Sequence, residues 1–187
     1  MEALLREYLP HAPKMGIHVA PDLPRPKVAA AVADYAPDVR ADEVLALYDN
    51  TVFGSAKDGV LFLRDRLVFQ NNDLDAPRTI RYEDLVDVRV RRILLGGKKV
   101  ELDVNRGRAT VTETLDFSAH GAAAPYVERF LREAMLAAAH AALARPAEAA
   151  KTMTDRAAVE AALDQLRTEG RLSDADRQRL LVALRGD

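Results

Sequence analysis

The side chains best suited to catalysis or metal binding are few and scattered in this chain. The four histidines are His11, His18, His120 and His140, and no two of them have the spacing of metal ligands. The chain has no cysteine, which excludes a thiolate nucleophile, a Cys-ligated zinc site and a disulfide framework. Surface or capping roles are favoured for the histidines, and we expect no metal ion and no cofactor.

The loops rich in glycine, aspartate and asparagine lack catalytic or ion-binding frames. "GSAKDG" (54–59) has no Gly-x-Ser-x-Gly spacing, and "LLGGKK" (94–99) lacks the Gly-x-x-x-x-Gly-Lys-Ser/Thr frame of a phosphate loop. Residues 49–58 and "NNDLDAP" (71–77) lack the ligand spacing of an EF-hand, so turn formation explains them more simply. We expect a protein that is not an enzyme, although catalytic groups can also converge from distant loops.

A cluster of positive charge around one expected hairpin is the candidate binding site. Its residues are Arg89, Arg91, Arg92, Lys98 and Lys99, preceded by Arg78 and Arg81. Such a cluster can attract an acidic partner, an anionic lipid head group or phosphate, and Leu94 and Leu95 at the tip would add apolar contacts. The alternative is a solvated sheet face whose charges are balanced by Glu101 and Asp103.

The composition is that of a soluble globular protein. The chain has 187 residues, a charged fraction of 30% and a net charge of −2, so we expect one domain with helical attachments and no nucleic-acid partner. The N-terminal residues have no apolar run of signal-peptide length, and no stretch approaches the length of a membrane span. We expect a cytoplasmic protein.

The middle of the chain predicts an antiparallel β structure. Seven short segments rich in strand formers are joined by polar loops too short for parallel crossovers. Their expected ranges are 43–49, 60–64, 66–70, 78–82, 86–94, 98–104 and 108–117. The runs "VLFLR" and "RLVFQ" are separated only by Asp65, which leaves open a tight hairpin or one bent strand. The expected architecture is mainly β with helices, an α+β fold whose meander closes into a sandwich or barrel.

Helices are expected on both sides of this β region. The N-terminal arm (1–42) should contain two short helices, at 2–9 and 25–36, which cover an open sheet edge or reach a partner. Residues 121–143 have an amphipathic helical pattern that ends the central domain (43–143). Residues 144–153 read as a linker, because Pro146 should break the helix.

The tail (154–187) has the pattern of a helical hairpin. Thr154 and Ser173 suit the caps of its two helices, Asp176 completes a capping box with Ser173, and Gly170 suits the turn. A hairpin this short cannot be stable alone, so it must pack on the main domain, a copy of itself or another protein. The candidate interaction residues are Leu163, Leu166, Leu172, Leu180, Leu181 and Leu184.

Two resemblances agree with these patterns. Seven antiparallel strands and a C-terminal amphipathic helix are the order of a pleckstrin-homology (PH) domain, and "LALYDNTVFGSAKDGVLF" with "IRYEDLVDVRV" resembles a group of bacterial PH-like domains of uncharacterised function. The match covers about residues 43–140 and implies a fold, not an activity. The segment "AALDQLRTEGRLSDADRQRLLVAL" is similar to a short C-terminal bacterial helical module (SHOCT-like) that is linked to oligomerisation.

These patterns lead to two functional hypotheses. In the first, the chain is a non-catalytic interaction and assembly module, and its tail mediates self-association or partner docking. In the second, it is a peripheral binder of anionic lipid or phosphate that uses the basic hairpin, residues 89–99.

Overall fold

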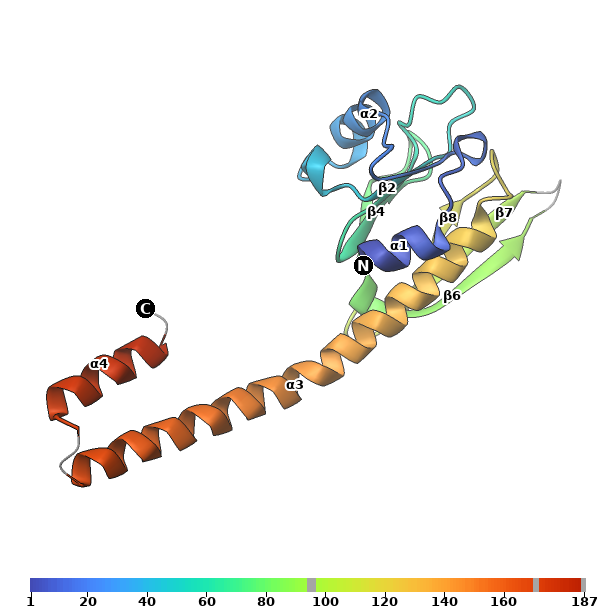
Figure 1. Cartoon of the computed structure of the whole chain (residues 1–187). Coiled ribbons are helices and arrows are strands. Elements are labelled where there is room, and N and C mark those ends of the chain that lie inside the picture. Colours follow the sequence, from blue (N-terminus) through green and yellow to red (C-terminus); the bar gives the residue numbers. More distant parts are fainter. Residues whose placement is uncertain (94–96, 170–171, 186–187) are drawn as a thin grey trace. The chain divides into compact units, whose positions relative to one another are not determined.

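The computed structural model describes residues 1–93, 97–169 and 172–185, with side chains throughout these ranges except at 143, 145–158 and 183–185. The chain forms two compact units, residues 1–139 and residues 140–187, which we call the first unit and the tail unit. Figure 1 labels the helices α1–α4 and five of the strands, β2, β4, β6, β7 and β8.

The first sheet is an antiparallel meander of five strands. They lie in the order β1 (Ile17–Val19), β2 (Ala46–Asp49), β3 (Gly59–Phe62), β4 (Arg66–Gln70) and β5 (Arg78–Arg81). Phe62 is opposite Leu67 across a tight turn, so the two apolar runs around Asp65 form a hairpin and not one bent strand. Strand β1 was not expected from the sequence, because three residues give no readable alternation; it pairs with β2, with Ile17 opposite Tyr48.

The second sheet has three antiparallel strands, β6 (Leu85–Arg92), β7 (Lys98–Asn105) and β8 (Thr110–Asp116). A short 3₁₀ helix, η3 (Tyr82–Asp84), joins β5 to β6. All seven predicted strands are therefore present, and the α+β class with antiparallel sheets is confirmed. The barrel alternative is wrong: among the described residues, the strands form two separate hydrogen-bonded sheets and no closed barrel.

Helices cover both faces of the first sheet (Figure 1). On one face, helix α2 (Arg25–Tyr35) packs Val28, Ala31 and Tyr35 against the sheet, whose buried residues there include Leu47, Leu61 and Val68. On the other face, α1 (Glu2–Tyr8) and the start of α3 (Ala124–Thr168) enclose the main core. A sheet buried on both faces needs apolar residues at every position, which explains why β3 and β4 read as continuous apolar runs.

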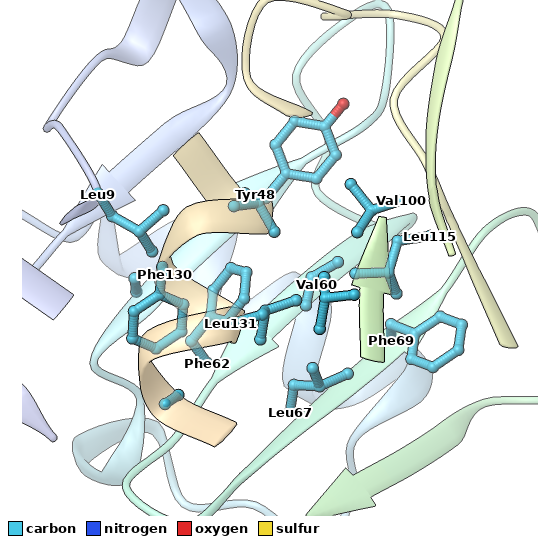
Figure 2. Close-up of a cluster of buried hydrophobic side chains, with 14 of the residues drawn as sticks. Leu9, Tyr48, Val60, Phe62, Leu67, Phe69, Val100, Leu115, Phe130 and Leu131 are labelled. Atoms are coloured by element: carbon cyan, nitrogen blue, oxygen red, sulfur yellow. The ribbon is translucent and has the colours of Figure 1, made fainter. Parts of the chain in front are cut away.

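The main core joins the two sheets to α1 and α3. Figure 2 shows Phe62 and Leu67 of the first sheet, Val100 and Leu115 of the second, and Leu9, Phe130 and Leu131 from the helical side. Phe130 makes edge-to-face contacts with Phe62 and Tyr82, with ring centroids 5.6 and 5.9 Å apart. The predicted apolar face of the C-terminal helix thus contacts strands far away in the sequence. The remaining short elements are two 3₁₀ helices, η1 (Pro13–Met15) and η2 (Ala41–Glu43).

Helix α3 continues through the segment that the sequence predicted to be a linker. It includes residues 144–153, so the predicted break at Pro146 is wrong, and Thr154 lies inside α3 instead of capping a new helix. Proline removes one backbone donor from a helix. Here the flanking residues are mostly alanine with Arg145, Glu148 and Lys151, which are strong helix formers that favour continuation on both sides.

The tail unit ends in α4 (Asp174–Arg185). The predicted Ser173 cap is confirmed, because the Asp176 backbone N–H donates to Ser173 Oγ at 3.1 Å. The reciprocal contact differs from that of a capping box: the Ser173 hydroxyl, and not its backbone N–H, donates to Asp176 Oδ2 at 2.7 Å. The predicted turn residue Gly170 lies outside the described residues.

Candidate functional site

The basic hairpin has its charges arranged in two groups. Arg89 and Arg91 lie on the outer face of β6 beside carboxylates: Arg89 Nη2 is 2.9 Å from Asp103 Oδ2, and Arg91 Nε is 2.9 Å from Glu101 Oε2. Asp87 adds a further contact to Arg89 at 3.2 Å. These two arginines are therefore compensated, as expected for a solvated sheet face. Exposed pairs of this kind contribute about 0–1 kcal/mol each.

The second group, Arg92, Lys98 and Lys99, lies at the strand ends next to the hairpin turn. Arg92 is opposite Lys98, and Arg91 is opposite Lys99. No ion pair within the described ranges involves Arg92, Lys98 or Lys99. Like charges directly opposite repel each other, so this end of the hairpin favours a negatively charged neighbour. The predicted apolar tip, Leu94 and Leu95, lies outside the described residues.

The two arginines that precede the hairpin in sequence are compensated elsewhere. Arg78 on β5 forms an ion pair with the buried Glu113 of β8, and Arg81 Nη1 is 2.8 Å from Glu83 Oε1. They tie β5 to neighbouring elements and do not enlarge the unpaired group at the hairpin end.

A buried polar cluster at the end of β2 was not recognised in the sequence. Asp49 is buried and accepts hydrogen bonds from Lys27 Nζ of α2 at 2.7 Å and from the Thr51 N–H and hydroxyl at 2.9 and 2.6 Å. Burial opposes ionisation of Asp49, but these hydrogen bonds outweigh it and hold its pKa below the usual value. Asp49 thereby anchors both α2 and the 50–58 loop to the sheet.

Several polar atoms near Asp49 are buried without a protein partner. They are His18 Nε2, Tyr35 Oη and Asp58 Oδ1. Burial, with the nearby charges of Lys27 and His11, lowers the pKa of His18. Burial and the neighbouring carboxylate of Asp73 raise the pKa of Asp58. The sequence signal for this cluster is an aspartate directly after the apolar run "LALY". Because an aspartate there is also typical of a turn, the sequence did not indicate a buried cluster.

The loops at this end of the sheet expose apolar side chains. Val52 is 81% and Phe53 98% exposed in the 50–58 loop, and Leu74 is 96% exposed in the 71–77 loop. Isolated exposed apolar residues are common, but fully exposed residues on adjacent loops are typical of an interaction surface.

Two clefts of the first unit, both lined by described residues, show no arrangement of catalytic groups. The larger polar cleft, of about 410 Å³, lies beside η2 and the β3–β4 turn. Its charged side chains pair with each other: Arg64 lies 3.2 Å from Glu2, and Arg66 lies 2.9 Å from Asp65. An apolar cleft of about 420 Å³ lies between α2 and η2 and is lined by Leu23, Val28, Ala29 and Ala41 with two charged residues at its rim. No nucleophile with an adjacent base lines either cleft.

The candidate residues of the tail unit differ in burial. Leu181 is buried, Leu163, Leu166 and Leu172 are half-buried, and Leu180 is exposed. Arg177 of α4 reaches Asp164 of α3 at 2.6 Å across the hairpin. Val159 and Val182 are also exposed. The side chain of Leu184 lies outside the described residues.

The described residues contain neither a metal site nor a membrane-spanning helix. Among residues 1–93, 97–169 and 172–185, no three histidine or carboxylate side chains come together as a metal site. Within the same ranges, no helix combines the length and the apolar character needed to cross a membrane.

Comparison of the chain with protein-family models, curated proteins and solved structures finds no match. The class of protein therefore rests on the geometry above: an α+β unit of two antiparallel sheets, joined to a helical tail.

Proposed function

We propose that the chain is a non-catalytic assembly module of the cytoplasm, built on a PH-like scaffold, whose helical tail mediates self-association. The observation that carries the proposal is the unbalanced burial of the tail unit. Leu181 is buried there, while Val159, Leu180 and Val182 are exposed. Two helices whose described side chains bury so little apolar surface gain too little free energy to stay folded alone. A second copy of the hairpin, which presents the same apolar side chains, would cover this surface.

The order of the elements supports the PH-like scaffold. Strands β2–β5 form four consecutive antiparallel strands, β6–β8 form three, and α3 follows with its apolar face on the core. The chain departs from this pattern at its N-terminus, where α1, β1 and α2 precede the strands and β1 extends the first sheet. The scaffold assignment concerns the fold and carries no ligand with it.

The test compares the solution mass of the full chain with that of a chain ending at Ala144, by size exclusion with light scattering. Ala144 lies beyond the last buried side chain of the first unit, Ala134, so truncation leaves that core intact. We expect an oligomer for the full chain and a smaller species for the truncated one. If the full chain and the truncated chain are both monomers, self-association is contradicted, and the tail packs on the first unit of its own chain or contacts a different protein.

A point variant with a matched control sharpens this test. Leu180→Asp places a charge at the exposed Leu180 of α4 and should abolish the tail contact, which lowers the solution mass. Asn105→Asp adds the same charge at an exposed position of the first unit and should leave the mass unchanged.

A second candidate function is binding of anionic lipid or phosphate through the 89–99 hairpin. The three cations without ion pairs, Arg92, Lys98 and Lys99, favour it, whereas the compensated Arg89 and Arg91 add little. Co-sedimentation with phosphatidylserine vesicles at low salt tests it, because screening is weakest there. Absence of binding under these conditions contradicts it.

A further inference from the structure

The 50–58 and 71–77 loops lie next to each other at one end of the first sheet. The first loop leads into β3 and the second leaves β4, and these strands are neighbours with Gly59 opposite Gln70. The loops therefore bring Val52, Phe53 and Leu74 to the same end of the molecule. We call these two loops the paired loops.

The paired loops are held in shape by their own hydrogen bonds. Thr51 Oγ1 accepts from the Ser55 N–H at 2.8 Å, and Thr51 is itself bound to the buried Asp49. In the second loop, Asn72 Oδ1 accepts from the Leu74 N–H at 2.9 Å. The exposed tips are thus presented in a fixed conformation, which lowers the entropy lost when a partner binds.

The charge of the paired loops is negative. They contain Asp58, Asp73 and Asp75 and only one cation, Lys57. Asp73 and Asp75 flank the exposed Leu74. A surface with apolar tips and an acidic rim fits an apolar surface edged by basic side chains, and it would be repelled by an anionic membrane.

A basic surface of this kind lies beside the paired loops on the same unit. The Asn71 side chain donates to the Thr114 carbonyl at 2.8 Å and accepts from the Asp116 N–H at 2.9 Å, which ties the second loop to the end of β8. Asp116 is opposite Lys99 on β7. The hairpin end with Arg92, Lys98 and the partly exposed Ile93 therefore adjoins the acidic paired loops.

We propose that two copies of the chain associate end to end about a two-fold axis, with the paired loops of each copy on the basic hairpin end of the other. A two-fold axis makes the same contact twice: the acidic surface of each copy lies on the basic surface of the other. Two opposite charges at one end of the unit can therefore both be neutralised in a single pair. The exposed Phe53 and Leu74 are the apolar anchors of this contact, and the charges set its register. This contact is separate from the tail and does not rest on tail-mediated association.

The test uses charge reversal in the full chain, measured by sedimentation equilibrium at low salt. Asp73→Lys/Asp75→Lys makes both surfaces of a copy basic, and Arg92→Glu/Lys98→Glu makes both acidic. Each variant alone should associate with itself at least about tenfold more weakly than the natural chain, the equivalent of roughly 1.4 kcal/mol. An equal mixture of the two variants should form a mixed pair, because each then offers the other complementary charge. Added salt should weaken both the natural and the mixed pair.

Two controls show whether the loss of association is specific to these two surfaces. Asp22→Lys/Asp38→Lys makes the same change in net charge at exposed aspartates outside both surfaces and should leave the association unchanged. All chains in this test also carry Leu180→Asp, so that the tail contact does not pair the copies, and the end-to-end pair of the chain with unreversed surfaces should persist in this background.

Three results would overturn the proposal. One is a natural chain with no salt-sensitive association, and another is a mixture of the two variants that does not pair. The third is a Phe53→Ser variant with unchanged mass that loses co-sedimentation with phosphatidylserine vesicles, which would mean that the loops dock on a bilayer.

Discussion

The first unit and the tail unit use similar apolar residues with very different outcomes. In the first unit, Phe62, Leu131 and their neighbours are covered on all sides by two sheets and two helices. In the tail unit, Leu181 is buried but Leu180, one residue before it, is exposed. The apolar pattern of a segment specifies whether it forms a helix or a strand. The number of helices and strands that pack together decides whether the unit they form is stable alone. We therefore expect mutations to be costly in the first unit and local in the tail.

The largest effect should follow from Phe130→Ala. Its ring packs against Phe62 and Tyr82 in the main core, so truncation leaves a cavity and should lower the free energy of unfolding by about 3–5 kcal/mol. Urea denaturation followed by circular dichroism measures this. Phe53→Ala is the matched control, because Phe53 is fully exposed, and it should change stability by no more than about 0.5 kcal/mol. Equal losses in both variants would contradict the burial described here.

A smaller effect should follow from Asp49→Asn. This change keeps the size of the side chain but leaves Lys27 without its carboxylate partner, and we expect a loss of about 2 kcal/mol, since Lys27 remains partly exposed. Because folding lowers the pKa of Asp49, its ionised carboxylate contributes to the free energy of unfolding above about pH 3.8. This contribution is lost as the pH falls below that value and through the lower pKa of the folded state. The variant and the natural chain should therefore converge in urea titrations at acid pH. Asp22→Asn, at an exposed position, is the control.

A local effect should follow from Ser173→Ala in the tail. Loss of the cap should destabilise α4 by about 1 kcal/mol. We expect faster amide exchange in residues 174–182 and no change in β2–β4, measured by hydrogen–deuterium exchange. Faster exchange in the strands as well would mean that the two units unfold together.

The smallest effect concerns His18 and pH. Folding lowers the pKa of His18, so below about pH 6.5 the unfolded chain binds more protons than the folded chain. Stability should therefore fall as pH decreases from 6.5 towards the lower pKa of the folded state and should be level above 6.5. His18→Gln should remove this slope, whereas His140→Gln, at an exposed position of α3, should retain it. A slope that survives in His18→Gln would assign the effect to another group.

The parts of the fold that could be predicted are those specified by local pattern. The alternation in β6 and β7, the Ser173–Asp176 cap and the apolar face of α3 each involve residues close in sequence. Strand β1 and the hydrogen bond between Lys27 and Asp49 depend on segments that meet only in the folded chain, so no local pattern marks them. The helix break predicted at Pro146 is wrong for a related reason. A single proline is a local signal for a helix end, but the alanine-rich segments on both sides favour continuation of the helix.

The candidate site was predictable only in part. The basic residues of the hairpin were visible in the sequence, but the division between compensated Arg89 and unpaired Lys98 requires knowledge of which carboxylates lie opposite. The exposure of Phe53 could not be predicted either, because an apolar residue in a loop can be buried or exposed and only the folded chain shows which.

The edges of the first sheet bear on the solubility of the chain. One edge is β1, only three residues long, and the other is β5, where Arg78 and Arg81 stand on either side of the buried Ile80. A short edge offers few backbone groups to an incoming strand, and charged side chains on an edge strand disfavour its pairing with another strand. Both edges of the first sheet therefore disfavour strand addition, so an association of copies through this sheet would use its loops and helices.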